Sequence, residues 1–555
     1  MTRVTVPLLR APLFPGPAVT LSEAATVPPA EDVVVDRLIA AMRQMRVGGA
    51  FWEKPVDPAG WRLIVRARSI PEARKLWAGL DESERSAALW LLPASLAGHA
   101  GIEALGQRSV MFGEVDPWSL LQGHVRLLAH GDDEWAALAA IAGCAVQFLS
   151  VGSHGAPGMT EAQLRRRVAD HLLGVRYRDP FTGQDTDAEA VVAQLTHWRR
   201  IVDANRTVVA ACGMAWWKRH EIARFLWSPG KKLRFFRSEK RALAHAARCN
   251  GAVAVWPSRI SAAMVRQAEA MGVPLVRVED GFVRSIGLGS DLVPPSSVTV
   301  DWQGIHYDPG RASDLEALLA SADFPLPLLA RAARLRAAIL AGGISKYGGA
   351  GEHVLPARQS GRRLLLVPGQ VEDDMSVRLG GAGLASNLEL LRRARALEPD
   401  AEIWFRPHPD VDAGHRKGAV SDAEALTLAD RVVRGGGMAE LLDRVDAVHV
   451  LTSLTGFEAL LRGRDVTCHG MPFYAGWGLT TDLMPASERR GRRLTLDQLV
   501  AAVLILYPRY LDPVTGLPCE PETLIRRMAH GDAANRLRWV TRIRRLQGRL
   551  MKRRR

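Results

Sequence analysis

The run VEDGFVRSIGLG, residues 278–289, follows a valine-rich apolar segment and brings two acids, a glycine and an arginine to the point where a strand should end. Two later runs have the same plan, FRPHPD at residues 405–410 and LTSLTGFEALL at residues 451–461. Open α/β sheets bind ligands in loops at the carboxyl ends of their parallel strands. The three runs therefore predict an α/β protein whose ligand site is assembled from several strand ends.

Strand and helix patterns alternate around these runs. TVVAACGMAWWKRHEIARFL from Thr207 predicts a strand, a glycine turn and a helix, and the segments 251–259 and 274–280 predict the next buried strands, with a helix over 262–272. Four more strand-then-loop units follow, at 363–374, 401–410, 447–456 and 465–472. This alternation predicts a GT-B-like α/β fold, two Rossmann-like halves facing a cleft.

An internal repeat indicates a further α/β region before the two halves. GVRYRDPFTGQ at 174–184 and YPRYLDPVTGLP at 507–518 share Arg-Tyr-x-Asp-Pro-x-Thr-Gly, and residues 133–155 correspond to residues 456–478. We interpret this as a duplicated α/β unit whose first copy is degenerate, because that copy has neither a His-Pro nor a Glu-Asp-Gly run. A chance likeness between two turns is the alternative.

The chain is therefore expected to divide into five segments. A glycine-rich stretch at 342–363 is expected to be a hinge between the two halves. The expected segments are an extended N-terminal segment (1–30), the shortened copy (31–205), a first half with the Glu-Asp-Gly run (206–360), a second, donor-binding half (361–530) and a basic amphipathic tail (531–555).

Composition favours a folded protein without disulfides. The chain has 555 residues, of which 47% are hydrophobic, enough for two to four units with their own cores. Prolines interrupt the N-terminus, so a signal peptide is not expected, and no apolar run is long enough to predict a membrane span. Five scattered cysteines favour reduced thiols in a cytoplasmic protein: Cys144, Cys212, Cys249, Cys468 and Cys519.

The formal charge of +14 implies an anionic partner. Ten basic and no acidic side chains fall between Arg536 and Arg555, with leucine, isoleucine and valine at near-helical spacing. Such a tail is typical of a helix lying on an anionic membrane surface, and a solvated terminal helix is the alternative left open. Nucleic acid is not expected as a partner, because no recognised binding motif accompanies the tail.

The candidate chemistry begins at Glu279 and Asp280. A carboxylate held at a strand end before Gly281 can act as a nucleophile or general base at an anomeric carbon, although a solvated pair of turn acids has the same pattern. Arg284 and Ser285 follow and could hold the carboxylate of an acidic sugar.

His408 is bracketed by Pro407 and Pro409, which restrict the backbone and so fix the direction of the imidazole. With Arg406 it could bind a phosphate and stabilise its departure as a nucleotide, and a structural histidine is the alternative.

Thr452, Ser453 and Thr455 precede a predicted helix, where free N–H groups and hydroxyls suit a phosphate. An ordinary cap, with Glu458 completing a capping box on Thr455, is compatible with that role. Gly369 and Gln370 form a similar junction, and the neighbouring Asp373 and Asp374 are expected to be solvated. No cluster has metal spacing, and no nucleophile elbow occurs.

Taken together, these runs resemble the bacterial capsular polysaccharide biosynthesis proteins of the KpsC/LipA type, the retaining β-Kdo transferases. The similarity covers roughly residues 205–530. It implies a GT-B enzyme that takes Kdo from CMP-Kdo, needs no metal or other cofactor, and builds a lipid-linked oligo-Kdo chain. The runs that carry it are EDGFVRSIGLGSDLVPPSSVTVDWQGIHYDP, ISKYGG, LLVPGQVEDDMS, RPHPD, LTSLTGFEALL, HGMPFYAGWGL and LILYPRYLDPVTG.

The resemblance also implies roles for residues and partners. Asp280 would be the nucleophile that forms a covalent Kdo adduct, with Glu279 supporting it and His408 acting on the CMP phosphate. The donor-binding set would be Arg284, Ser285, Gln370, Arg406, Pro409, Ser453, Thr455 and Glu458. The implied partners are CMP-Kdo, a lipid-linked Kdo or phosphatidylglycerol acceptor, other capsule synthesis or export proteins, and the inner face of the inner membrane.

The chain departs from the family pattern in one respect. Typical members carry two intact modules that form alternating linkages, whereas the first copy here is shortened and lacks both signatures, so we expect a single linkage. Two other hypotheses stay open: a non-catalytic component of capsule export with a sugar-nucleotide-binding fold, and a sugar-nucleotide epimerase. The residues also admit sialic acid in place of Kdo.

Overall fold

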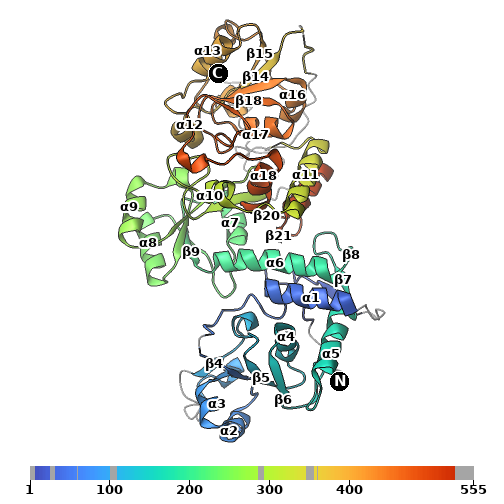
Figure 1. Cartoon of the computed structure of the whole chain (residues 1–555). Helices are drawn as coiled ribbons and strands as arrows, with labels where there is room; N and C mark the ends of the chain where they lie inside the picture. Colours follow the sequence, from blue (N-terminus) through green and yellow to red (C-terminus); the bar gives the residue numbers. More distant parts are fainter. Residues whose placement is uncertain are drawn as a thin grey trace. The chain divides into compact units, whose positions relative to one another are not determined.

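The computed structural model describes residues 7–24, 32–58, 60–99, 109–284, 293–345, 355–358, 361–414 and 416–531. The chain divides into two compact units. The first comprises residues 1–206 and 226–232, and the second comprises residues 207–225 and 233–555. Each unit is built of sheets covered by helices, as Figure 1 shows.

A five-stranded parallel sheet forms the centre of the first unit, in the order β4-β3-β2-β5-β6. The central strands β2 and β3 are buried along their whole length, as expected for a parallel sheet with both faces covered. The strands are β2 (Leu63–Val65), β3 (Ala88–Leu92), β4 (Val110–Phe112), β5 (Arg126–Ala129) and β6 (Ala145–Phe148), with helices α2 (Ile70–Gly79), α3 (Glu82–Ser86) and α4 (Glu134–Ala142).

A small sheet and three further helices complete this unit. The helices are α1 (Asp32–Met45), α5 (Glu161–Leu173) and α6 (Ala188–Asn205), and the sheet contains β1 (Ser22–Ala24), β7 (Val175–Arg178) and β8 (Asp185–Thr186).

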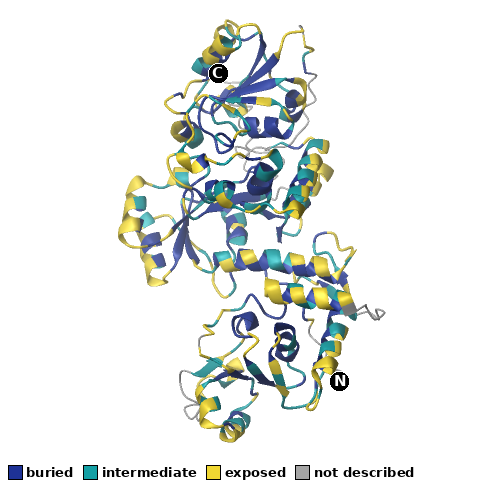
Figure 2. Cartoon of the chain, in the orientation of Figure 1, coloured by how far each residue is buried: buried dark blue, intermediate teal, exposed yellow. Residues whose placement is uncertain are grey.

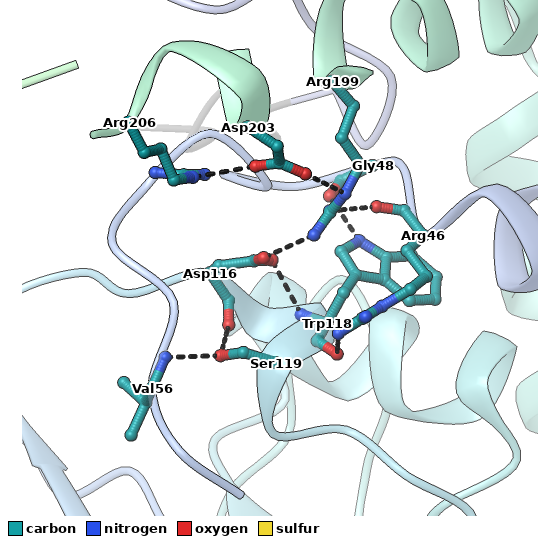
Figure 3. A network of polar contacts seen from close by, with 9 residues as sticks. All are labelled: Arg46, Gly48, Val56, Asp116, Trp118, Ser119, Arg199, Asp203 and Arg206. Carbon is teal, nitrogen blue, oxygen red and sulfur yellow. Dashed lines mark hydrogen bonds and ion pairs between the residues drawn. The ribbon is translucent and has the colours of Figure 1, made fainter. Parts of the chain in front are cut away.

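A buried polar network connects α6 to two loops of the first unit (Figure 3). Arg199 on α6 pairs with the buried Asp116, with Nη2 2.6 Å from Oδ2. The indole of Trp118 donates to the carbonyl of Gly48 at 2.9 Å. The guanidinium of Arg199 also donates to the carbonyl of Arg46. Because each of these groups is satisfied within the protein, the network stabilises the unit as long as it stays complete.

The second unit contains two sheets, which we call the first half and the second half. The sheet of the first half has seven strands in the order β10-β9-β11-β12-β13-β20-β21. Strands β10, β9, β11 and β12 are parallel, and β13, β20 and β21 pair antiparallel. The strands are β9 (Val208–Cys212), β10 (Arg234–Phe236), β11 (Ala252–Val255), β12 (Leu275–Asp280), β13 (Ser297–Asp301), β20 (Pro508–Leu511) and β21 (Pro518–Cys519).

Helices cover this sheet with amphipathic faces. On α8, Ala242, Leu243 and Ala246 are buried against β9 and β11, while the opposite face is exposed (Figure 2). The helices of the first half are α7 (Arg219–Phe225), α8 (Glu239–Arg248), α9 (Ala262–Ala270), α10 (Asp314–Ser321), α11 (Leu326–Ala341), α18 (Leu496–Val500), the π-helical turn η9 (Ala501–Leu506) and α19 (Pro521–His530).

The sheet of the second half has six parallel strands in the order β16-β15-β14-β17-β18-β19. Buried side chains of β14 and β15, among them Leu365 and Phe405, pack against α13 to form its core. The elements are β14 (Leu364–Pro368), β15 (Glu402–Arg406), β16 (Arg431–Val432), β17 (Ala447–Val450), β18 (Asp465–Cys468), β19 (Thr481–Asp482), α12 (Met375–Gly380), α13 (Asn387–Leu397), α14 (Pro409–Asp412), α15 (Asp422–Ala425), α16 (Met438–Arg444) and α17 (Leu454–Leu461).

The predicted strands β9, β11, β12, β14, β15, β17 and β18 are confirmed, and so is the mixed α/β class. One predicted boundary differs. The sequence pattern assigns residues 361–530 to the second half, but β20 and β21 hydrogen-bond in the sheet of the first half. The reason is that β13 offers an open antiparallel edge, which β20 fills. The chain therefore crosses to the second half and returns.

Some expectations concern residues outside the described parts. These are residues 532–555 of the basic tail, residues 346–354, 359 and 360 of the expected hinge, and residues 1–6 and 25–30 of the N-terminal segment. The five cysteines are free, and only Cys249 is exposed. Among the described residues, no helix combines the length and apolarity needed to cross a bilayer.

The internal repeat has matching local structure. The Tyr177 hydroxyl donates to the Leu172 carbonyl at 2.6 Å, and the Tyr510 hydroxyl donates to the Leu504 carbonyl at 2.7 Å, each reaching back to the preceding helix. The five strands of the parallel sheet in the first unit, β4-β3-β2-β5-β6, also have the same order as the first five strands of the second half, β16-β15-β14-β17-β18. The first unit thus repeats the topology of the second half.

Candidate functional site

A cavity of about 640 Å³ lies in the second unit, where strand ends of both halves meet. This volume is within the range of small-ligand sites. Its lining includes Lys218, Trp256, Arg259, Glu279, Asp280 and Tyr307 from the first half, and Gln370, Arg406, His408, Pro409, Ser453, Thr455 and Glu458 from the second half. The structure therefore brings the three runs together in one cavity, as their positions at strand ends predicted.

Asp280 is the last residue of β12 and is held by two cations. Lys218 Nζ lies 2.8 Å from its Oδ1, and Arg284 Nε lies 2.8 Å from its Oδ2. Burial alone would raise the pKa of the carboxyl, but Lys218 and Arg284 outweigh it and hold the pKa of Asp280 well below its usual value. The side chain is therefore ionised, and each oxygen keeps a second lone pair for a ligand.

Gly281 is required by a close contact and not by a left-handed backbone. Its φ is not positive. A Cβ built on Gly281 would lie 2.1 Å from the Oγ of Ser297, the first residue of β13. The glycine is required because the end of β12 passes directly against the adjacent strand, and this contact fixes the backbone of Asp280.

Lys218 is a site residue that the sequence analysis missed. It lies at the end of the short turn Trp216–Lys218, beyond β9, and is 7% exposed. Its Nζ sits 3.6 Å from the centroid of the Trp256 ring, a cation–π contact that accompanies the ion pair with Asp280. The sequence GMAWWKRH places this lysine after a predicted strand, which was the one indication that it could belong to the site. A single sequence does not show that it pairs with an acid 62 residues away.

Arg284 does not lie where a residue that binds the sugar would be expected. Its side chain is fully buried and does not line the cavity. One edge of its guanidinium donates to Asp280, and Nη2 donates to the carbonyl of Val293 at 2.7 Å. The structure thus places Arg284 behind Asp280, where it supports the carboxylate, and not on the cavity wall where a contact with a sugar carboxylate was predicted. Ser285 lies outside the described residues.

His408 and Arg406 line the cavity from the end of β15. The Asp410 N–H donates to His408 Nδ1 at 3.2 Å, which assigns the proton of a neutral imidazole to Nε2. Pro409 is the first residue of α14 and fixes the backbone at this point. Arg406 donates to the carbonyls of Gly435 and Gly436, so part of its guanidinium shapes the neighbouring glycine turn.

Helix α17 begins two residues earlier than the sequence predicted, because its N-cap is Ser453 and not Thr455. Ser453 is the N-cap of α17, and its Oγ accepts from the Thr455 N–H at 3.2 Å. The predicted capping box between Thr455 and Glu458 is therefore wrong, since both residues lie inside the helix. Both are nevertheless buried residues of the cavity wall. The hydroxyls and free N–H groups at this helix start remain suited to an anion.

Gln370 joins two strand ends. Its Nε2 donates to Thr452 Oγ1 at 3.0 Å, and its Oε1 accepts from the Thr452 N–H at 2.9 Å. The backbone N–H of Gln370 donates to Asn387 Oδ1 at 2.8 Å. Because both ends of the Gln370 amide are engaged, we expect it to position the loop before α17 rather than to contact a ligand directly.

Acids near the cavity do not form a metal site within the described ranges. Asp373 pairs with Arg416 at 3.0 Å on the exposed surface, and Asp374 is the N-cap of α12, accepting from the Ser376 N–H. Neither side chain is arranged with a second acid or histidine as a cation would require.

The two walls of the cavity have complementary chemistry. The first half offers an ionised carboxylate, and the second half offers an imidazole, an arginine and a helix N-terminus. A carboxylate facing groups that stabilise a leaving anion is an arrangement for displacement at carbon.

Comparison with known proteins gives relatives for this region. The model of the family "Capsule polysaccharide biosynthesis protein" matches residues 251–510. The capsule polysaccharide modification protein LipA of Neisseria meningitidis serogroup A is 40% identical over 356 residues, 64% of this chain and 50% of LipA. The lipopolysaccharide-processing protein LpsZ of Rhizobium meliloti is 44% identical over 261 residues, 46% of this chain and 59% of LpsZ.

A solved structure is also similar. The β-Kdo 2,4 transferase structure of Thermosulfurimonas dismutans KpsC is 33% identical, with a TM-score of 0.51, and the match covers 58% of this chain and 98% of that chain. By contrast, this chain spans about half the length of LipA.

Proposed function

Because the chain belongs to the KpsC/LipA-type family of capsule polysaccharide biosynthesis proteins, we propose that it is a retaining glycosyltransferase that moves Kdo from CMP-Kdo to a lipid-linked acceptor. The observation that carries the proposal is the convergence of Asp280 with His408 and Ser453 on a single cavity.

In the first step, a carboxylate oxygen of Asp280 attacks the anomeric carbon of Kdo. The bond from that carbon to the phosphate oxygen breaks, and its electron pair leaves with CMP. His408 Nε2–H and the N-terminus of α17 stabilise the phosphate charge that develops on departure. Lys218 and Arg284 keep Asp280 ionised, so no base is needed to activate it.

In the second step, a hydroxyl oxygen of the acceptor attacks the same carbon. The bond to Asp280 breaks and the electron pair returns to the carboxylate, while the hydroxyl proton passes to a base or to water. Two displacements at one carbon retain its configuration. Glu279 lines the cavity beside Asp280 and is our candidate for the base.

The first unit supports a single catalytic site. After β5 the N-cap of the next helix is Asp133, preceded by Asp132, whereas after β17 the N-cap is Ser453, preceded by Thr452. Asp133 pairs with Arg66 at 2.5 Å, and Asp132 pairs with Arg68. Acids at this position repel a phosphate, and the cations that could attract one are already paired. We infer that the first unit does not bind the donor.

The position at the inner face of the inner membrane is also a proposal. It is supported by the cationic sequence from Arg536 to Arg555, since the lipid surface and the donor are both anionic. Binding to anionic vesicles, compared with neutral vesicles and with a chain ending at Gly531, tests it.

Mass spectrometry of the trapped protein tests the catalytic proposal. Incubation with CMP-Kdo and no acceptor should add one Kdo to the peptide that contains Asp280, and addition of a Kdo-lipid acceptor should remove it with extension of the lipid. Asp280→Asn should give no adduct and no transfer while keeping the native melting profile. Tight binding of CMP-Kdo without turnover would instead favour the non-catalytic alternative.

A further inference from the structure

Three cations line the cavity in the described part of the chain, and two of them have protein partners. Lys218 pairs with Asp280, and Arg406 donates to the carbonyls of Gly435 and Gly436. The third, Arg259, is exposed, and its side chain has no hydrogen bond or ion pair with any described residue. It is therefore the cavity cation that is available to a ligand.

The backbone of Arg259 lies in the turn after β11, the strand that pairs with β12. Arg259 ends the turn η6 (Pro257–Arg259), which follows β11 directly, and β11 pairs with β12, the strand that ends at Asp280. Gly213, at the end of the neighbouring β9, packs against it, since a Cβ on Gly213 would lie 3.3 Å from the Cβ of Arg259. The guanidinium thus extends from a rigid strand end of the first half.

In the second half, His408 and the N-terminus of α17 are suited to the phosphate of the donor. We therefore expect Arg259, on the first half, to bind a different anionic group. An acidic sugar brings a carboxylate, and the buried Arg284 cannot reach it. A guanidinium matches a carboxylate through two parallel N–H donors. We propose that Arg259 binds the carboxylate of an acidic sugar in this cavity and thereby selects acidic over neutral sugars.

This inference rests on the proposed function and adds the residue that recognises the sugar. The carboxylate has two sources, the sugar of the donor and the terminal sugar of the acceptor. Both present the same group to Arg259, and kinetics separate them. A contact with the donor changes donor binding when no acceptor is present, whereas a contact with the acceptor changes only the acceptor KM.

The experiment compares Arg259→Gln with the wild-type protein and with Arg266→Gln. Arg266 lies on α9 of the same half, is exposed and does not line the cavity, so its substitution makes the same charge change away from the site. Calorimetry measures the affinities for CMP-Kdo and for CMP. Initial rates with a Kdo-lipid acceptor, and with the same acceptor as its neutral methyl ester, measure transfer.

We expect Arg259→Gln to weaken one interaction by about 10- to 100-fold, the loss typical of a charge-assisted hydrogen bond. If the donor carboxylate is bound, affinity for CMP-Kdo falls while affinity for CMP is unchanged. If the acceptor carboxylate is bound, the acceptor KM rises and the wild-type preference for the acid over its methyl ester disappears.

The inference is overturned if Arg259→Gln matches the wild type and Arg266→Gln in both measurements while the wild type transfers Kdo. If the wild-type protein binds CMP-Kdo without turning it over, the result contradicts the proposed function alone. The calorimetric affinities of Arg259→Gln for CMP-Kdo and CMP then decide the role of Arg259. A wild type that binds CMP-Kdo no better than CMP, and does not turn it over, overturns both.

Discussion

Lys218 Nζ and Asp280 Oδ1 are 2.8 Å apart, in a pair that joins the turn after β9 to the end of β12. The ammonium also lies over Trp256, so the lysine is held from two sides. Its position makes Lys218 a positioning residue for the carboxylate, since one of its contacts is to the group proposed to react.

Lys218→Met should therefore change the pH dependence of transfer. In the wild type the lowered pKa keeps Asp280 ionised between about pH 5 and 8, and the stability that this ionisation contributes is lost only as the pH falls below the ordinary value of about 3.9. Without Lys218, burial is opposed by Arg284 alone and the pKa rises. The acid limb of the kcat profile should move to higher pH.

Lys218→Arg is the matched control, because it keeps a cation and should keep the acid limb near its wild-type position. An identical acid limb for Lys218→Met and the wild type would show that Arg284 alone sets the ionisation of Asp280. Thermal melting of each variant checks that the fold is intact over the measured pH range.

His408→Ala should lower kcat by about 100-fold, the loss typical of one donor to a developing oxyanion. The hydrogen bond from the Asp410 N–H leaves Nε2 as the protonated nitrogen, and alanine removes that donor. His530→Ala is the control, since His530 is exposed on α19 and bonds to the Arg526 carbonyl. Steady-state rates at saturating CMP-Kdo measure the effect. A change confined to KM would assign His408 to donor binding only.

Gly281→Ala should reduce both stability and transfer. The new methyl group would overlap Ser297 and displace the end of β12, and with it Asp280. Overpacking of this kind typically costs about 1–3 kcal/mol of unfolding free energy. Gly361→Ala is the control, because a Cβ at Gly361 would have no neighbouring atom within 4 Å. Denaturant unfolding and initial rates distinguish the two variants, and wild-type values for Gly281→Ala would contradict the crowding.

Arg199→Met should destabilise the first unit by about 3–5 kcal/mol, because Asp116 would stay buried without its partner. Figure 3 shows the polar contacts around this pair. The double variant with Asp116→Leu should recover part of the loss. Melting curves measure stability, and transfer rates are taken below the first transition. A fall in kcat at that temperature would show that the first unit contributes to catalysis.

The strand ends that carry chemistry can be predicted from sequence, because apolar runs followed by unusual polar clusters are local signals. Asp280, His408 and Ser453 are found in this way and share one cavity. The roles of cations cannot be predicted, since they depend on burial. Arg284 follows the acid in sequence yet lies behind it, while Lys218 is distant in sequence and touches it.

The return of the chain to the first sheet is also beyond sequence reasoning. β20 is recognisable as part of a repeat, but its partner β13 lies about 200 residues earlier, and strand pairing over such a separation leaves no local pattern. The helix start at Ser453 is missed for a simpler reason. Three hydroxyl residues in four positions can each cap a helix, and packing chooses among them.

The late return of β20 and β21 has a consequence for chimaeras. Exchanging the second half between relatives cannot be done with a single junction, because β20 and β21, which follow that half in the chain, belong to the sheet of the first half. A recipient that lost residues 495–531 would expose the edge of β13 and invite aggregation. A working hybrid needs two junctions, one before and one after the second half. The recipient then keeps its own β9–β13 region and its own β20 and β21.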